Sequence, residues 1–206
     1  MVSAIHAQDV SLERGGRLIV SKLSFSVCSG AALVLKGANG TGKTTLLRAV
    51  AGFLPLASGV IEAEGGDRER EISDQAHYVG HLNANKLSMS VFENLKFWCD
   101  VNGGAATGIK QALEAFDLHA LAHIPASYLS AGQRRRLGLA RLLVAERPIW
   151  LLDEPTTALD SSSQEAFMRA CNDHLAMGGL LIAATHMPLT FATSEELQLG
   201  CGGPCA

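Results

Sequence analysis

The spacing of apolar residues changes along the chain, and this change predicts the order of the first elements. Residues 1–35 are β-rich, with strands expected over Ser24–Cys28 and Ala31–Lys36. From Gly42 to Ala51 the apolar residues recur at helical spacing, and Gly52 follows as a helix stop. The sequence therefore predicts a strand, a glycine-containing loop and a helix in succession.

Helical patterns and apolar strands make up the rest of the chain. Residues 88–128 carry only helical patterns, which predict an inserted helical subdomain of about residues 86–142. Its helices are expected around Val91–Val101, Ile109–Phe116 and Leu118–His123. A long helix, a strand, a helix and a strand are then expected over about Gly132–Ala145, Ile149–Leu152, Ser163–Met177 and Leu180–Ala184. Strands that are apolar on both faces indicate an α/β fold: a mostly parallel sheet with helices on both faces, after an N-terminal antiparallel β part.

Composition limits the class of protein. The length suits a single domain over residues 1–206, and the 48% hydrophobic content prompts a search for membrane spans. No apolar run reaches the roughly 18 residues of a span, so we expect no direct membrane insertion and a membrane connection only through a partner. The N-terminus lacks a secretory signal pattern, which favours a cytosolic chain. A net charge of −3 and a pI near 6.1 give no electrostatic footprint for nucleic acid.

The cysteines do not look like a disulfide framework, because they are odd in number and scattered. They are Cys28, Cys99, Cys171, Cys201 and Cys205. The last two stand in a glycine-rich end, where we expect a flexible tail of about residues 198–206 rather than a metal site or a disulfide.

The segment Gly37–Thr45 carries the strongest chemical motif. Its residues are Gly37, Ala38, Asn39, Gly40, Thr41, Gly42, Lys43, Thr44 and Thr45. Glycines let backbone N–H groups surround a phosphate, and the following helix presents its positive N-terminus to the same anion. Lys43 is expected to neutralise the β- and γ-phosphates of ATP, and Thr44 to offer its hydroxyl to Mg²⁺. A chance match is the alternative; the strand and helix around the loop favour a P-loop NTPase with a RecA-like sheet.

Two adjacent carboxylates follow the apolar strand at residues 149–152. Such a strand end lies at the carboxyl edge of the sheet, where ligands of open α/β folds bind. Asp153 is expected to hold Mg²⁺, directly or through water, and Glu154 to polarise the attacking water as a general base. Solvated acids that simply end a strand are the alternative, and the phosphate loop makes the catalytic interpretation the stronger one.

The segment Leu129–Gln133 narrows the class further. It closely resembles the LSGGQ signature of the ATP-binding-cassette family. Its serine, Ser130, lies 23 residues before Asp153 (153 minus 130). The resemblance implies that this segment acts in trans, facing the γ-phosphate bound by the second cassette of a homodimer. The residues concerned are Ser130, Ala131, Gly132 and Gln133, of which Ala131 departs from the commoner glycine. A plain helix cap by Ser130 is the alternative, and both readings are compatible.

Three further positions take roles from the same resemblance. Asp160 matches the D-loop, which crosses the dimer interface. His186 matches the switch histidine that contacts the γ-phosphate, and with Glu154 and Lys43 it makes up the expected catalytic set. His81 falls where the family has its Q-loop glutamine, and whether it replaces that contact to Mg²⁺ stays open. For His186 the alternative is a structural role, which is the commoner one for a lone histidine at a strand end, but its order and spacing relative to the other motifs favour function.

Softer features point to one branch of this family. They are Gly80-His81, Ile124-Pro125, Leu139-Ala140-Arg141-Leu142 and the run Ala184-Thr185-His186-Met187-Pro188-Leu189. Together they resemble the ATP-binding subunits of cytochrome c biogenesis, or haem exporter, complexes. The resemblance implies an ATPase that powers haem export or the release of a haem-loaded periplasmic chaperone. It also implies a peripheral location on the cytoplasmic side of the bacterial inner membrane, where the helical insertion near His81–Phe97 binds a polytopic permease subunit.

Other functions remain open from the sequence alone. One is an ATPase subunit for another cargo, such as a lipoprotein or a drug. Another is a soluble cassette ATPase with no transport role, although such proteins usually carry two fused cassettes or a long coiled coil. A third is an inert nucleotide-binding module, against which the retention of Lys43, Asp153, Glu154 and His186 argues.

Overall fold

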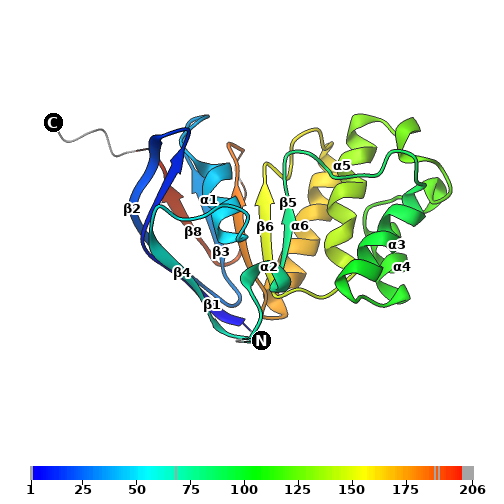
Figure 1. The fold of residues 1–206 in the computed structure, drawn as a ribbon. Coiled ribbons are helices and arrows are strands. Elements are labelled where there is room, and N and C mark those ends of the chain that lie inside the picture. Colours follow the sequence, from blue (N-terminus) through cyan, green and yellow to red (C-terminus); the bar gives the residue numbers. More distant parts are fainter. Residues whose placement is uncertain (1, 68, 188, 190, 201–206) are drawn as a thin grey trace. The chain divides into compact units, whose positions relative to one another are not determined.

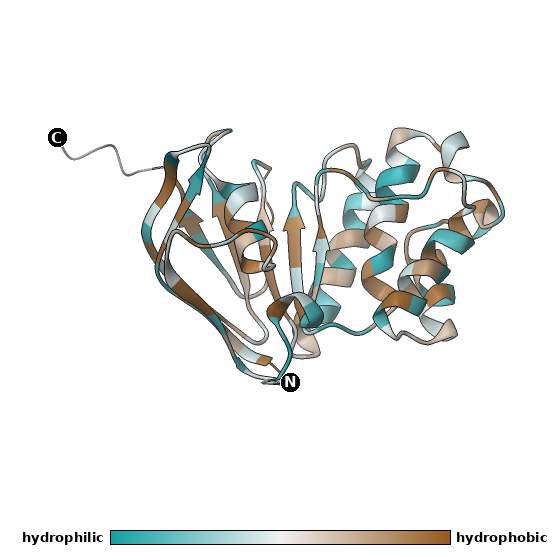
Figure 2. Ribbon diagram, in the orientation of Figure 1, coloured by the Kyte–Doolittle hydropathy of each residue, from teal (hydrophilic) through white to brown (hydrophobic). Residues whose placement is uncertain are grey.

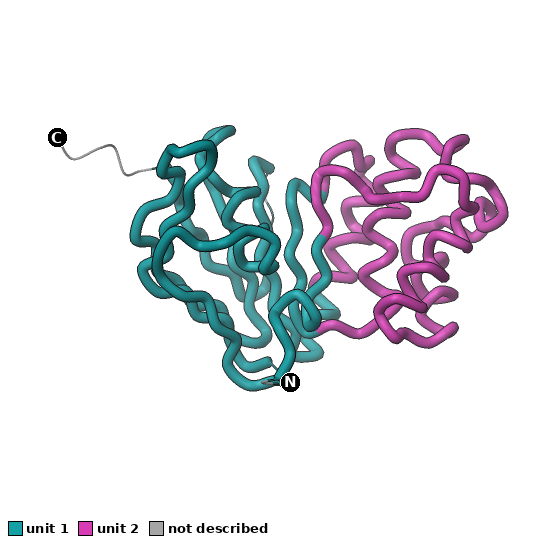
Figure 3. Tube along the Cα trace, viewed as in Figure 1, with its two compact units in different colours: residues 1–78, 148–155, 172–206 teal, residues 79–147, 156–171 magenta. Residues whose placement is uncertain are grey.

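The computed structural model describes residues 2–67, 69–187, 189 and 191–200. These residues form two compact units, which Figure 3 shows in separate colours. Unit 1 comprises residues 1–78, 148–155 and 172–206, and unit 2 comprises residues 79–147 and 156–171. Cys28, Cys99 and Cys171 are free thiols. Residues 201–206 of the expected tail, with Cys201 and Cys205, lie outside the described residues.

An antiparallel sheet with the strand order β2-β1-β4 forms the first part of unit 1 (Figure 1). Its strands are β1 (Val2–Arg14), β2 (Arg17–Cys28) and β4 (Ser58–Gly65). Gly15 and Gly16 connect β1 to β2 with φ angles of 58° and 74°, which suit glycine in a tight hairpin. The predicted antiparallel part is confirmed, and the expected strand Ser24–Cys28 is the end of a longer strand.

A second sheet has the order β5-β6-β7-β3-β8. Its strands are β3 (Ala32–Lys36), β5 (Ala76–Val79), β6 (Ile149–Asp153), β7 (Leu180–Ala184) and β8 (Ser194–Gln198). The pairs of β3 with β7, β3 with β8 and β6 with β7 are parallel, which confirms the predicted sheet. The helix α1 (Lys43–Val50) follows β3, and the short helix α2 (Ile72–Gln75) precedes β5.

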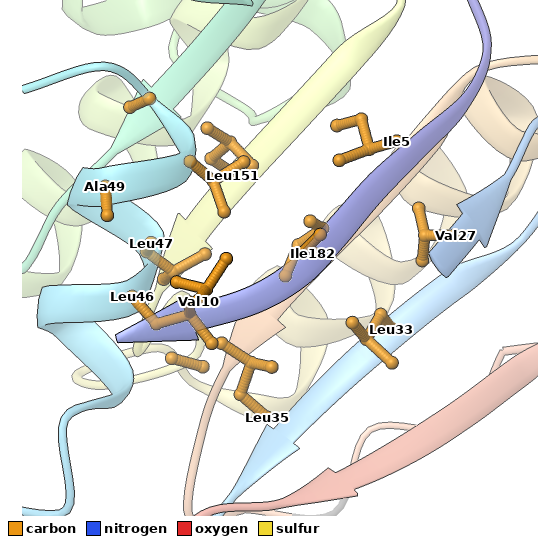
Figure 4. Packing of buried hydrophobic residues seen from close by; sticks show 14 of the residues in the cluster. Ile5, Val10, Val27, Leu33, Leu35, Leu46, Leu47, Ala49, Leu151 and Ile182 are labelled. Carbon is orange, nitrogen blue, oxygen red and sulfur yellow. The ribbon is translucent and has the colours of Figure 1, made fainter. Parts of the chain in front are cut away.

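The central strands of this sheet are buried on both faces. Figure 4 shows Leu33 and Ile182 on the face that also meets Leu46 of α1 and Ile5 of β1. On the other face, the Trp150 ring stacks on His174 with centroids 4.0 Å apart. Strands β3, β6 and β7 are accordingly hydrophobic along almost their whole length, as Figure 2 shows.

Unit 2 is helical. It contains α3 (Val91–Asn102), α4 (Ala106–Ala115), α5 (Ala131–Ala140) and the first part of α6 (Ser161–Ala176). Short 3₁₀ turns lie at His119–Leu121, Ala126–Tyr128 and Arg141–Leu143. Among the described residues, no helix is both long and apolar enough to cross a membrane.

Two of the expected helices are shorter than predicted. The long helix expected to run to Ala145 ends at Ala140, where its last turn tightens into the 3₁₀ turn Arg141–Leu143. The pattern at Leu118–His123 forms only the 3₁₀ turn His119–Leu121. Apolar periodicity locates both segments but does not distinguish an α-helical turn from a 3₁₀ turn, since both bury residues three apart.

Candidate functional site

The predicted phosphate loop joins β3 to α1 and contains three glycines with positive φ. Gly37, Gly40 and Gly42 have φ angles of 144°, 87° and 100°. A Cβ at Gly37 would lie 2.7 Å from the carbonyl oxygen of Leu199, and one at Gly42 would lie 2.7 Å from a methyl carbon of Ile19. The backbone therefore passes its neighbours too closely for any side chain at these two positions.

Lys43 is folded onto this loop. Its Nζ donates hydrogen bonds to the carbonyl oxygens of Gly37 at 2.7 Å and Ala38 at 3.0 Å, and the residue is buried. The hydroxyl of Thr41 donates to the same Ala38 oxygen at 2.9 Å. Carbonyl groups do not neutralise an ammonium, so the loop keeps a positive charge that favours an anion such as a phosphate. The remaining residues of the predicted loop are Asn39 and Gly40, which are exposed, and Thr45, which is buried.

Thr44 and Asp153 meet although they lie 109 residues apart. The Thr44 hydroxyl is 3.0 Å from Oδ1 and 2.9 Å from Oδ2 of Asp153, which ends β6 and is only 3% exposed. A hydroxyl and a carboxylate are hard oxygen donors of the kind that Mg²⁺ prefers. Within the described residues no cluster of three or more His, Cys, Asp or Glu side chains offers a metal site. One hydroxyl and one carboxylate fit a cation that keeps several waters, as Mg²⁺ does.

A second side-chain contact in unit 1, besides that of Thr44 with Asp153, joins Glu154 to His186. Glu154 has a φ of 48° and its backbone N–H donates to the Ala184 oxygen at 2.8 Å, which fixes it beside the end of β7. Its Oε2 lies 2.8 Å from Nδ1 of His186. A non-glycine residue with positive φ costs energy, and strained residues of this kind cluster at functional sites. The structure thus brings the predicted base and the predicted switch histidine into contact.

The predicted signature segment begins α5 in unit 2. The Ser130 hydroxyl accepts a hydrogen bond from the Gln133 N–H at 3.2 Å, and the Ser130 N–H donates to Oε1 of Gln133 at 2.8 Å. This reciprocal pair is a capping box, so the helix-cap interpretation of Ser130 is confirmed. A Cβ at Gly132 would lie 3.1 Å from the carbonyl oxygen of Ala158, while Ala131 is exposed. The action of this segment on a second cassette stays a prediction.

His81 and Asp160 also belong to unit 2. His81 lines a cavity of about 190 Å³ together with Asn83, Ala131, Arg134, Arg135, Thr157 and Ala158. Asp160 caps α6, because its Oδ1 accepts from the Ser163 N–H at 2.8 Å and from the Ser162 hydroxyl at 3.0 Å. The hydrogen bonds from Ser163, followed by that from Ser162, hold the pKa of Asp160 below its usual value. The predicted roles of both residues toward nucleotide stay predictions.

Two buried arginines near this cavity make contacts that the sequence did not predict. Nη1 of Arg135 donates to the Gly80 oxygen at 3.0 Å and to Oδ1 of Asn83 at 2.8 Å. Arg141 donates to the Asn83 carbonyl at 3.2 Å and lies over the Trp98 ring, 4.7 Å from its centroid. The signal was present, because Arg135 shares the helical face of the buried residues four and seven positions later.

Comparison with known proteins agrees with the fold and with these motifs. The ABC transporter family profile matches residues 20–157. The cytochrome c biogenesis ATP-binding export protein CcmA of Rhodopseudomonas palustris (strain BisB5) is 55% identical over 187 residues, or 91% of this chain and 93% of that protein. Its counterpart in Mesorhizobium japonicum is 47% identical over 96% of this chain and 98% of its own length.

A solved structure supports the same assignment. CbiO1 from Clostridium perfringens, part of the ABC transporter complex cbiONQ, superimposes with a TM-score of 0.73 at 25% identity. The match covers 91% of this chain and 80% of that one. The chain therefore belongs to the ABC transporter family and, within it, to the family of the cytochrome c biogenesis ATP-binding export protein CcmA.

Proposed function

We propose that the chain is the ATP-hydrolysing subunit of an ABC transporter complex for c-type cytochrome biogenesis. In that complex it powers haem export or the release of a haem-loaded periplasmic chaperone. The proposal rests on two contacts made by the adjacent carboxylates. Asp153 bonds to Thr44 of the phosphate loop, and Glu154 bonds to His186. The relatives named for cytochrome c biogenesis support the choice of cargo.

Each residue of unit 1 has a distinct task in hydrolysis. Backbone N–H groups of the loop and the Lys43 ammonium bind the β- and γ-phosphates of ATP. Thr44 and Asp153 hold Mg²⁺, which when bound neutralises charge on the phosphates. Glu154 accepts a proton from the attacking water, and His186 orients Glu154 and the γ-phosphate. Because phosphoryl transfer depends mainly on positioning and electrostatics, these contacts supply one subunit's share of the catalysis.

Activity also requires a second copy of the chain. The N-terminus of α5 carries a partial positive charge that suits an anion, and within its first turn the Ser130 hydroxyl caps the Gln133 N–H. In a homodimer, Ser130 and the backbone at Gly132 complete the site on the γ-phosphate held by the partner's loop. Asp160 contributes at the same interface, and His81 takes the Q-loop position toward Mg²⁺.

A polytopic permease subunit binds unit 2. The unit exposes large apolar side chains around its 87–92 and 122–127 segments, which are joined by hydrogen bonds such as Val91 N–H to Ile124 oxygen at 3.0 Å. These side chains are Leu87, Phe92, Ile124 and Tyr128. Large exposed apolar residues that gather in one place are typical of a protein interface. Binding there places the chain peripherally on the cytoplasmic side of the bacterial inner membrane.

Replacement of the base tests the enzymatic part of the proposal. Glu154→Gln removes the proton acceptor but leaves the phosphate loop intact, so it should bind ATP and lose turnover by at least about 100-fold. With ATP it should accumulate as a dimer in size-exclusion chromatography. Glu146→Gln, at an exposed glutamate, is the matched control and should behave as the wild type. Undiminished turnover by Glu154→Gln would refute the assignment.

Deletion in the host tests the cargo. Loss of the chain should abolish covalently haem-bearing c-type cytochromes and leave b-type cytochromes in place. The wild-type chain should restore them, whereas Glu154→Gln should not. Normal c-type cytochromes in the deletion strain would contradict the proposed cargo, and the chain would then be an ATPase subunit for another cargo.

A further inference from the structure

Thr185 is a polar residue in an entirely buried position. It lies between Ala184, the last residue of β7, and His186, and its exposed fraction is 0%. Its backbone N–H donates to the Leu35 oxygen at 3.4 Å, on the strand that leads into the phosphate loop. A buried hydroxyl is costly unless it is hydrogen-bonded, so its partners indicate why it is there.

Among the described residues, the Thr185 hydroxyl bonds to the backbone of Met187. The Thr185 hydroxyl accepts from the Met187 N–H at 3.0 Å and donates to the Met187 carbonyl at 3.3 Å. Nζ of Lys36 donates to the same carbonyl at 3.3 Å. The two hydrogen bonds of Thr185 close a small ring over the backbone of His186, and Lys36 fixes this ring from β3.

This ring matters because the His186 side chain is itself poorly confined. The side chain is 59% exposed, against 17% for that of Glu154. An exposed side chain on an unrestrained loop loses conformational entropy when it is held in one orientation. With the backbone fixed on both sides of residue 186, its N–H lies 3.4 Å and its Nδ1 2.8 Å from the same Oε2 of Glu154.

We infer that the Thr185 hydroxyl is a positioning group for hydrolysis, which holds the backbone of residues 186–187 so that the His186 imidazole meets Glu154. The inference rests on the proposed function. Thr185 acts through His186 rather than on the nucleotide, because its side chain is bonded to Met187 and not to the phosphate loop. Its loss should therefore lower kcat and leave nucleotide affinity unchanged.

An isosteric pair of variants tests this inference. Thr185→Val keeps the shape and removes the hydroxyl, and it should lower kcat about 10-fold with KM within about twofold. Thr185→Ser keeps the hydroxyl and should retain kcat within about threefold. Thr193→Val, at an exposed threonine of the same unit, is the control. Wild-type kcat in Thr185→Val, or equal losses in the valine and serine variants, would overturn the inference.

Two further measurements make the result decisive. Lys36→Met removes the second donor to the Met187 oxygen, together with an exposed ion pair to Glu196, and should lower kcat about threefold. It provides a test if Thr185→Val does not fold. Amide hydrogen exchange at Met187 should be faster in Thr185→Val than in the wild type by about 10-fold. Amide exchange can be measured whether or not the chain hydrolyses ATP. If Glu154→Gln hydrolysed ATP as fast as the wild type, the proposed function would be refuted. The exchange rate at Met187 would still decide the role of Thr185. Unchanged exchange at Met187 would refute that role.

Discussion

The two halves of the predicted site are held in place by different means. In unit 1, Asp153 and Glu154 lie at the end of β6, His186 follows β7 and the phosphate loop follows β3. Parallel neighbouring strands end at one edge of a sheet, so strand order brings these residues to the same edge. In unit 2, side chains do this: the segment that carries His81 is held by Arg135. A site built on strand ends follows from sequence spacing, whereas one held by buried side chains does not.

The largest effect should come from the phosphate loop. Lys43→Ala removes the buried ammonium that unit 1 offers to an anion, so turnover should fall by about 100-fold or more and ATP affinity should fall with it. Steady-state hydrolysis and binding of a fluorescent ATP analogue measure the two losses. Lys110→Ala, at an exposed lysine of unit 2, should change neither. Normal ATP binding by Lys43→Ala would show that the loop does not hold the phosphates.

Most of unit 1 was predictable from the sequence. The apolar runs at residues 149–152 and 180–184 match β6 and β7 to within a residue, because a strand buried on both faces has no polar positions. The strand β8 was missed, since Ser194–Gln198 is polar and largely exposed at the edge of its sheet. The contact between the Thr185 hydroxyl and Met187 was missed for a different reason: Met187 is apolar and takes part only through its backbone N–H and carbonyl.

Unit 2 was predictable in outline only. Helical spacing located α3 and α4, and the signature resemblance located the start of α5. The role of Arg135 depends on which carbonyl groups surround it, and those come from residues 80 and 83, more than 50 positions away. Periodicity reports which face is buried but not what lies opposite a polar residue on that face.

Acid should destabilise unit 1 through His174. Burial, the largest cause, lowers the pKa of this histidine from 6.5 to about 4, although its ring bonds the Leu180 oxygen at 3.2 Å. Below pH 6.5 His174 is therefore protonated in the unfolded chain but stays neutral in the folded chain until the pH approaches 4. Stability is unaffected above pH 6.5 and falls by about 3 kcal/mol as the pH decreases to 4.

Urea unfolding at pH 8 and pH 4 measures this loss. His174→Phe keeps a ring against Trp150 but cannot titrate, so the pH dependence between 6.5 and 4 should be weaker by that amount. If the wild type and the variant lose stability in parallel, His174 is not the group responsible.

Removal of Arg135 should weaken unit 2 and spare unit 1. Arg135→Met leaves the Gly80 oxygen and the Asn83 amide oxygen without their buried charged donor, which costs about 2–3 kcal/mol. Thermal unfolding measures the cost, and the affinity for ATP should remain that of the wild type. The neighbouring Arg134→Met, at a half-buried position, should cost less than about 0.5 kcal/mol. A loss of ATP affinity in Arg135→Met would show that the two halves are not held independently.

The smallest effect on stability should separate capping from catalysis in Ser130. Unit 2 provides a matched pair, because Ser90 begins α3 with the same capping box and the same backbone angles, φ −64° and ψ 167°. Ser90→Ala and Ser130→Ala should each cost about 1 kcal/mol, since each loses one cap. Only Ser130→Ala should also lower turnover, because only Ser130 is expected to reach a phosphate on a second copy. Equal turnover in the two variants would reduce Ser130 to a helix cap and would leave hydrolysis to unit 1 alone.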